Sequence, residues 1–246
     1  MALLELINVN KIYNQGKIIA LHGIDLVVEK GEFITIFGPS GSGKTTLLNI
    51  ISVLDKPTSG RFFFDGIDLL ELDSKDLGQY KSTNIGYIPR NNVFIPDKDV
   101  FQNLRYNSKL IGKDKYKTKN RLIKILHDVG LNGLENRRPN ELNNCQKKRL
   151  AIAMAIVKEP VLLLADEPTV NQDSKASNEI MEILVKITED LGITLIYSTK
   201  NRQIIDYAYR IIGINEGMIT NNERTEENDM LCLKILETLL FPGQIV

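Results

Sequence analysis

The sequence predicts an α/β protein whose core is a mainly parallel sheet, with an antiparallel β segment at the N-terminus and an inserted helical subdomain. Short apolar runs alternate with stretches of helical spacing over most of the chain, which is the pattern of β-α repeats. The beginning of the chain instead contains two runs rich in β-branched and aliphatic residues around one turn. From about residue 91 to 158 the strand pattern is absent, which indicates the helical insertion.

The predicted elements begin with an antiparallel pair, Leu3–Tyr13 and Ile18–Glu29, which the turn residues 14–17 connect. Phe33–Phe37 is a short apolar strand that runs into glycines, and a helix is predicted from Lys44. Later apolar runs predict further strands at Arg61–Asp65, Ile85–Ile88, Val161–Ala165, Ile193–Ser198 and Arg210–Ile214. Helical patterns fill most of the intervals, so these strands are expected to be mainly parallel.

Two segments are predicted to stand apart from the α/β core. The helical subdomain covers about 91–158, where apolar residues recur at helical spacing, for example within 122–129. The core domain is predicted to extend over 1–222 with this subdomain inserted. Residues 223–246 are expected to form an acidic linker and a C-terminal helix at Met230–Phe241. That helix is expected to pack on the chain itself, with a partner subunit as the alternative.

Composition excludes several classes of protein. Thirty-one basic and thirty-one acidic side chains cancel, so no global field favours nucleic acid, and no nucleic-acid partner is expected. Apolar stretches such as Ala151–Val157 are far shorter than the roughly 20 residues of a membrane-spanning helix. The N-terminus lacks the pattern of a signal peptide, so a cytoplasmic location is expected. Two cysteines, Cys145 and Cys232, are too few for a disulfide framework.

The clearest motif is Gly38–Thr45, which has the spacing G-x-x-x-x-G-K-[ST] and lies between a predicted strand and a predicted helix. Its glycines allow backbone N–H groups to surround phosphate oxygens, and the helix N-terminus adds its dipole. Lys44 is expected to reach the β- and γ-phosphates of ATP, and the Thr45 hydroxyl to coordinate Mg²⁺. A plain glycine turn before a core helix is the alternative. The residues predicted to bind ATP here are Gly38, Ser40, Gly41, Ser42, Gly43, Lys44, Thr45 and Thr46.

A second motif is the pair of acids, Asp166 and Glu167, that ends the apolar run Val161–Ala165. At the carboxyl edge of a parallel sheet, Asp166 is expected to hold Mg²⁺, usually through water. Glu167 is expected to polarise the attacking water and is the predicted catalytic residue. A strand end that simply meets solvent is the alternative.

These motifs together resemble the ABC ATPase family, which has a P-loop NTPase core. Gly38–Thr46 matches its Walker A segment, Val161–Glu167 its Walker B segment, and Tyr13 the aromatic residue that stacks on adenine. The resemblance runs from about Leu3 to Ile219 and looks strongest to the branch that releases lipoproteins and exports macrolides and antimicrobial peptides. An aromatic residue that fills a strand surface is the alternative reading of Tyr13.

The resemblance also implies which subunits the chain binds and where in the cell it is located. Members of this family act as dimers of ATP-binding subunits, with ATP between Walker A of one subunit and a Leu-Ser-Gly-Gly-Gln signature of the other. The expected partners are therefore a second ATP-binding subunit, in a homodimer or a heterodimer, and an integral-membrane permease. The chain is expected to sit at the inner face of the membrane through that permease.

The signature segment departs from the family pattern. It reads Leu142, then Asn143, Asn144, Cys145 and Gln146, so both family glycines are replaced. The added Cβ atoms are expected to weaken the sandwiching of the nucleotide, because a forced positive φ would cost on the order of 1–3 kcal/mol at each of the two former glycines. Asn143 is expected to offer amide donors in place of the serine hydroxyl, and the following helix N-terminus stays available to an anion.

Two further positions depart from the family, and one does not. Arg90 stands where the family has a glutamine; a guanidinium repels Mg²⁺, although it can pair with a phosphate or with Glu167. Lys200 stands where the family has its switch histidine and supplies charge without an acceptor. For both residues an exposed cation with no role is the alternative. Asp173, the aspartate of the D-loop, is present.

Two functions are left open by these departures. The first is an ATPase subunit that drives a permease and hydrolyses ATP slowly, or does so with a better-equipped partner subunit, with turnover impaired by Arg90, by residues 143–145 and by Lys200. The second is an ATP-binding regulatory subunit with little turnover. DNA-repair ATPases with similar heads need a long coiled-coil insertion, for which 246 residues leave no room.

Overall fold

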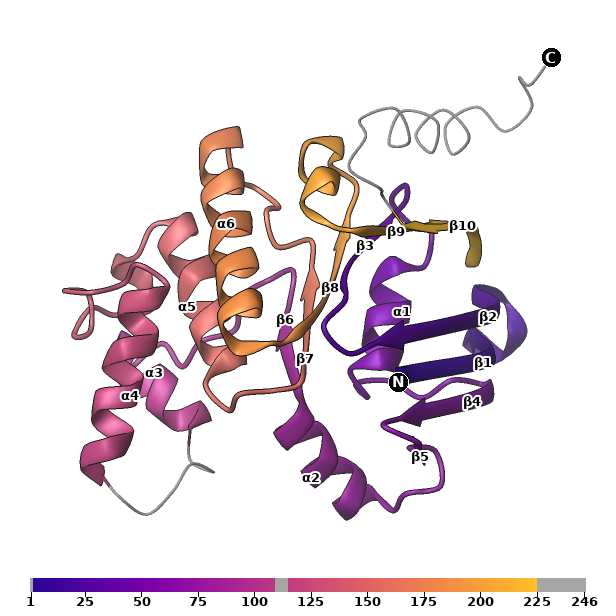
Figure 1. Cartoon of the computed structure of the whole chain (residues 1–246), viewed down its shortest axis with the longest axis horizontal. Coiled ribbons are helices and arrows are strands. Elements are labelled where there is room, and N and C mark those ends of the chain that lie inside the picture. Colours follow the sequence, from indigo (N-terminus) through magenta and orange to yellow (C-terminus); the bar gives the residue numbers. More distant parts are fainter. Residues whose placement is uncertain (1, 109–114, 225–246) are drawn as a thin grey trace. The chain divides into compact units, whose positions relative to one another are not determined.

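The computed structural model describes residues 2–108 and 115–224 (Figure 1). The chain divides into two compact units, one from the described parts of Met1–Lys81 and Thr194–Val246, the other from those of Ser82–Ile193. The helix predicted at Met230–Phe241 lies outside the described residues.

An antiparallel sheet opens the first unit, in the strand order β2-β1-β4-β5. Its strands are β1 (Ala2–Tyr13), β2 (Ile18–Glu29), β4 (Ser59–Phe64) and β5 (Ile67–Asp68). A short 3₁₀ turn, η1 (Asn14–Gly16), joins the first two strands. Apolar side chains on one face of these strands are buried, which explains the partial alternation in the sequence.

The same unit contains a second set of strands, in the order β10-β9-β3-β8. One of them leads into the Gly38–Thr45 segment, which we call the phosphate loop. The strands are β3 (Phe33–Phe37), β8 (Thr194–Thr199), β9 (Arg210–Asn215) and β10 (Met218–Arg224), with helix α1 (Lys44–Ile51) and the 3₁₀ segment η3 (Arg202–Tyr207). β3 pairs in parallel with both β8 and β9, whereas β10 pairs antiparallel with β9. All five residues of β3 are buried, as its continuous apolar run predicts for a central parallel strand.

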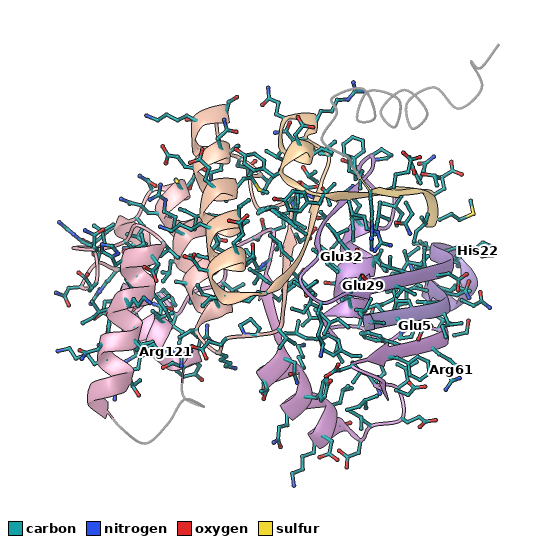
Figure 2. The ribbon with its side chains drawn as sticks, in the orientation of Figure 1. Glu5, His22, Glu29, Glu32, Arg61 and Arg121 are labelled. Atoms are coloured by element: carbon teal, nitrogen blue, oxygen red, sulfur yellow. The ribbon has the colours of Figure 1, made fainter. Side chains whose placement is uncertain are left out.

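Strand β10 is held by a cluster of ion pairs at its end; two of the acids, Glu29 and Glu32, are labelled in Figure 2. Glu32 accepts from Arg210 at 2.8 Å and from Arg224 at 3.0 Å, and Glu29 lies 3.6 Å from Arg224. Arg210 and Glu32 are both largely buried, so their pair anchors the sheet edge more firmly than a surface pair would.

The second unit contains a parallel pair, β6 (Ile85–Ile88) and β7 (Leu162–Asp166), together with the helices of the insertion. Helix α2 (Ser74–Asn84) leads into β6. The other helical segments are α3 (Val100–Asn107), α4 (Lys115–Asp128), η2 (Pro139–Glu141), α5 (Asn144–Ile156) and α6 (Ser174–Leu191). The strand-free interval of the sequence therefore corresponds to α3, α4, η2 and α5.

The predicted fold class is confirmed, and each predicted strand is present within two residues of its expected ends. β5 and β10 were not predicted. The polar stretch after Gly217 continues as strand up to Arg224, within the segment that the sequence assigned to a linker. Among the described residues, no helix combines the length and the apolar character needed to cross a membrane.

Candidate functional site

The phosphate loop leaves the carboxyl end of β3 and enters α1. Lys44 begins the helix, and its side chain returns over the loop, where Nζ donates to Gly38 O at 2.8 Å and to Pro39 O at 2.7 Å. Lys44 is only 5% exposed. An ammonium that is held among loop carbonyls in this way is in position for an anion enclosed by the same loop.

The glycines of the loop are required by geometry at two points. Gly43 has a φ of 106°, and a Cβ there would lie 2.7 Å from Ala20 O. A Cβ on Gly38 would collide with Ile214 O. The loop is also tied from the side, because Gly217 N donates to Ser42 O at 3.0 Å. Sequence reasoning gave Gly217 no site role; its position in the tight turn before β10 is the signal that was available.

Ser42 tests whether the loop fits a phosphate. Its Oγ is buried and has no hydrogen-bond partner within the part of the chain that the structure describes. A buried hydroxyl without a partner carries a desolvation cost that a phosphate oxygen would remove. Ser40 and Thr45 are exposed and Thr46 is half-buried, so these hydroxyls lie at the accessible rim. The loop therefore fits a bound phosphate chain.

Tyr13, the predicted adenine-stacking residue, is half-buried and is fixed by polar contacts. Its hydroxyl donates to Asp55 Oδ2 at 2.7 Å, and Lys11 donates to Asp55 Oδ1 at 2.6 Å. The Lys11 ammonium also lies 4.8 Å from the centre of the Tyr13 ring. Burial and the Asp55 hydrogen bond raise the pKa of Tyr13, so it is the neutral phenol. The ring is rigidly placed, and one of its faces is covered by a cation.

Burial alone would raise the pKa of Asp55, but the hydrogen bonds from Lys11, Tyr13 and Lys56 N together lower it. Asp55 is therefore a carboxylate, and it fixes the Tyr13 ring by accepting the hydrogen bond of its hydroxyl. The sequence contains no local motif for this role, because Asp55 and Tyr13 are far apart along the chain.

Lys200 lies at the same sheet edge as the phosphate loop. In the parallel pairing of β3 and β8, Phe37 is opposite Thr199, so Gly38 and Lys200 follow directly on neighbouring strands. Lys200 is exposed. A cation at this edge can attract a phosphate but has no lone pair with which to orient water.

In the second unit, Asp166 and Glu167 lie at the carboxyl end of a parallel strand, as the phosphate loop does in the first unit. In the parallel pairing of β6 and β7, Ile88 is opposite Ala165, so the segment after β6 meets Asp166 and Glu167 at one edge. Both acids are nearly buried, at 2% and 8% exposure. Glu167 has a φ of 44°, a left-handed backbone that costs about 1–3 kcal/mol in a residue other than glycine. The surrounding structure therefore holds Glu167 in a backbone conformation that the residue itself disfavours.

Two neighbouring groups are affected by the charge of Asp166. Burial and the charge of Asp166 together raise the pKa of Tyr87 to about 12. Burial lowers the pKa of Lys148 to about 8, and the charge of Asp166 opposes that change. Sequence reasoning did not single out Lys148, because it is flanked by the cations Lys147 and Arg149 and nothing in the spacing shows which of the three points inward.

Arg90 is brought to Glu167, as one of the alternatives for this residue predicted. Its Nη2 lies 3.4 Å from Glu167 Oε2, and the arginine side chain is 47% exposed, whereas that of the glutamate is 9% exposed. The contact is an ion pair of moderate length between a half-exposed cation and a nearly buried carboxylate.

The signature segment forms an ordinary helix start, so the predicted strain is wrong. Asn143 is the N-cap of α5, with φ of −73° and ψ of 172°, and the helix itself begins at Asn144. Neither Asn144 nor Cys145 has a positive φ. The physical reason is that asparagine is a favoured N-cap: Asn143 Oδ1 accepts from Gln146 N at 2.8 Å, and Gln146 Oε1 accepts from Asn143 N at 3.0 Å. What remains of the departure is two added side chains on the first helical turn.

Asp173 also serves as an N-cap. Its Oδ1 accepts from Ala176 N at 2.7 Å at the start of α6, and Asn171 before it has a φ of 61°. The D-loop aspartate thus fixes a bent segment and the helix behind it.

A divalent cation fits the residues only as a partner of the nucleotide. The described residues contain no group of three or more His, Cys, Asp or Glu side chains that could hold a metal by themselves. Thr45 in the first unit offers a hydroxyl and Asp166 in the second a carboxylate, and either is a type of ligand that Mg²⁺ accepts beside phosphate oxygens and water.

Known proteins agree with this geometry. Residues 21–170 match the family described as ABC transporter. An uncharacterised ABC transporter ATP-binding protein of Thermotoga maritima is 37% identical over 90% of this chain and 95% of its own length. The lipoprotein-releasing system ATP-binding protein LolD of Syntrophus aciditrophicus is 36% identical over 83% of this chain and 92% of its own length.

A solved structure extends the similarity to three dimensions. The ATP-binding cassette MJ0796 of Methanocaldococcus jannaschii, a dimer in a post-hydrolysis state bound to ADP and Pi, has a TM-score of 0.84 at 33% identity. The alignment covers 92% of this chain and all of that one. The chain belongs to the ABC transporter family, as one of its ATP-binding subunits.

Proposed function

We propose that the chain binds MgATP on the Gly38–Thr45 loop, hydrolyses it slowly, and drives an integral-membrane permease as half of a dimer of ATP-binding subunits. The observation that carries the proposal is the buried Ser42 Oγ, which has no hydrogen-bond partner among the described residues and belongs to the same loop whose carbonyls hold the Lys44 ammonium; this arrangement fits a phosphate chain. Bound Mg²⁺ would supply charge neutralisation for the phosphates, with Thr45 and Asp166 as its protein ligands.

Hydrolysis requires a group that orients and polarises water, and in this proposal Glu167 is that group. Its near-complete burial and its strained backbone support a chemical role rather than a solvated strand end. The Glu167 carboxylate accepts a proton from the attacking water as the water oxygen bonds to the γ-phosphorus, and the bond from that phosphorus to the β–γ bridging oxygen breaks, so that ADP leaves.

Slow turnover follows from three departures that act on different parts of the reaction. Arg90 pairs with Glu167, Lys200 has no acceptor for water, and Asn144 with Cys145 adds bulk where the dimer partner's nucleotide would approach. One lost transition-state contact typically costs about 10²–10³ in rate, and such effects do not simply add.

The dimer is supported by the dimeric arrangement of the MJ0796 cassette and by the intact helix start at Asn143. The capping box uses Asn143 Oδ1, while the side-chain nitrogen Nδ2 can still donate to a phosphate oxygen of the nucleotide on a facing subunit. The α5 N-terminus adds its dipole to the same site.

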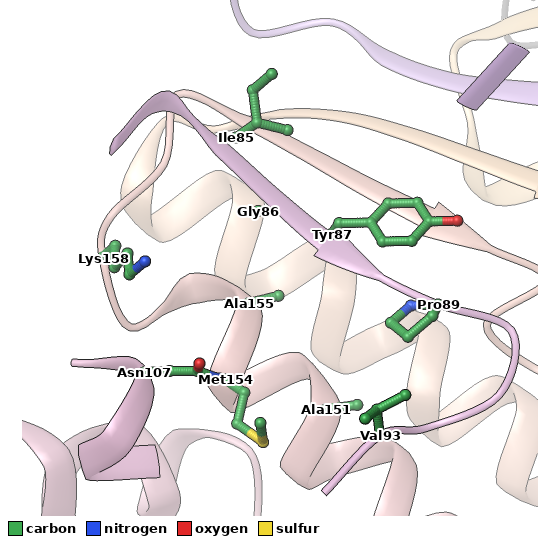
Figure 3. A pocket seen from close by; sticks show the side chains of 10 residues that line it. All are labelled: Ile85, Gly86, Tyr87, Pro89, Val93, Asn107, Ala151, Met154, Ala155 and Lys158. Atoms are coloured by element: carbon green, nitrogen blue, oxygen red, sulfur yellow. The ribbon is translucent and has the colours of Figure 1, made fainter. Parts of the chain in front are cut away.

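A cavity in the second unit supports contact with a permease (Figure 3). It has a volume of about 340 Å³ and lies between the strand and loop at Ile85–Val93, Asn107 of α3, and the 151–158 segment. Val93 at its rim is 75% exposed, which is unusual for a valine and favours an apolar partner segment. Because the permease carries the chain to the membrane, the expected location is the inner membrane face.

Steady-state phosphate release tests the proposal, measured for the chain alone and with its membrane partner. We expect slow release that depends on Mg²⁺, is stimulated by the partner and is abolished by Glu167→Gln. Release indistinguishable from that of Glu167→Gln, together with retained ATP binding, would instead identify a non-hydrolysing regulatory subunit.

A further inference from the structure

Lys148 is a nearly fully buried lysine in the same unit as Glu167, the proposed catalytic carboxylate. It is 2% exposed, on the first part of α5. Burying an ammonium is costly unless hydrogen bonds compensate it. Its Nζ donates to Pro89 O at 3.1 Å and to Arg90 O at 3.3 Å. The two acceptors are consecutive backbone carbonyls.

These two carbonyls belong to the segment that carries Arg90 to Glu167. The segment leaves β6 immediately after Ile88, with no helix or strand hydrogen bonds of its own up to α3. The Lys148 ammonium is therefore a fixed point on α5 from which the backbone at Arg90 is held. The guanidinium of that residue then reaches Glu167 Oε2 at 3.4 Å.

We infer that Lys148 is a positioning residue for Glu167, acting through the backbone of Pro89 and Arg90 to hold the Arg90 guanidinium on the carboxylate. The held guanidinium restrains Glu167, because it lies 3.4 Å from Oε2, one of the two oxygens that could accept a proton from water. This inference rests on the proposed function, since the restrained group is the proposed base.

The same segment borders the cavity of Figure 3. Pro89 lines the cavity and accepts from Lys148, and Ala151 and Ala155 line it from the helical face that lies three and seven residues beyond Lys148. Anything that shifts Pro89 consequently acts on the hydrogen bonds of Lys148 and on the reach of Arg90.

A double-mutant cycle on turnover tests the inference. Arg90→Gln is expected to raise kcat by about tenfold, and Lys148→Met by about threefold to tenfold, with the KM for ATP within about twofold of wild type. In the Arg90→Gln background, Lys148→Met is expected to have no further effect. Lys124→Met, at an exposed position of α4, is the matched control and leaves kcat unchanged. Equal factors for Lys148→Met in both backgrounds, or a kcat that falls only with the folded fraction, would overturn the inference.

A second cycle does not depend on hydrolysis, and so separates failure of this inference from failure of the proposed function. Unfolding constants are measured for Arg90→Gln, Glu167→Gln and the double variant, with and without Lys148→Met. The coupling between Arg90 and Glu167 is expected to be roughly threefold in the unfolding constant, and to be lost when Lys148→Met is present. Coupling that persists unchanged would show that Lys148 does not position the pair. If no variant hydrolyses ATP while this coupling behaves as expected, the proposed turnover fails and the positioning role stands.

Discussion

The ammonium of Lys148 makes the stability of the protein depend on pH in an unusual direction. Burial places its pKa at about 8 in the folded protein, against 10.5 for an unburied lysine. At pH 7 the group carries its proton in both states, and the folded state bears the cost of the buried charge, which is about 3 kcal/mol at 1.36 kcal/mol per pKa unit. Between pH 8 and 10.5 the folded protein has lost the proton while the unfolded chain retains it, so stability rises with pH.

Comparison with Lys148→Met isolates this contribution, because all other titrating groups are common to the two chains. From pH 7 to pH 9.5 the free energy of unfolding of wild type is expected to rise by about 2 kcal/mol relative to the variant. Urea unfolding at the two pH values, followed by far-UV circular dichroism, measures the difference. Lys124→Met, which removes an exposed ammonium, is expected to show no such difference from wild type.

Parallel behaviour of wild type and Lys148→Met would refute the burial of this charge. A relative loss of stability with rising pH would refute it as well, since that sign requires a pKa raised by folding.

Two further predictions concern the nucleotide half of the site. Gly38→Ala is expected to destabilise the protein by about 3 kcal/mol or to prevent folding, because its Cβ would collide with Ile214 O; Gly41→Ala, at a φ of 82° with open space around it, is expected to cost only about 1–2 kcal/mol, and thermal unfolding distinguishes them. Tyr13→Ala is expected to weaken ATP binding by a factor corresponding to about 1–3 kcal/mol, whereas Tyr13→Phe keeps the ring and loses only the hydrogen bond to Asp55. Equal affinities for the two Tyr13 variants in an equilibrium titration would exclude stacking.

The elements that could be predicted from the sequence are those whose signal lies within one short segment. Continuous apolar runs predicted β3 and β7, and the glycine-lysine motif predicted the loop into α1. β10 was missed because Met218–Arg224 is mostly polar: it is a strand through pairing with β9 across the Glu216–Gly217 turn, where both residues have positive φ. The available signal was the Glu216–Gly217 turn pair that follows the apolar strand.

The site was predictable to the same extent. The structure puts the two predicted motifs at the carboxyl ends of β3 and β7, and that position follows from parallel pairing. The strain predicted at Asn144 and Cys145 was wrong because it was carried over from glycine positions, whereas asparagine stabilises a standard helix start. Asp55 and Lys148 could not have been identified, since their roles come from contacts between distant segments.

Equilibrium binding of ATP to the full chain tests the central claim most directly. In a calorimetric titration with Mg²⁺ present, wild type and Lys124→Met are expected to bind ATP equally. Lys44→Met is expected to bind it about 10-fold to 150-fold more weakly, through loss of a charge-assisted hydrogen bond worth about 1.5–3 kcal/mol. No binding by wild type, or binding of equal strength by Lys44→Met, would contradict the assignment of the Gly38–Thr45 loop as the nucleotide site.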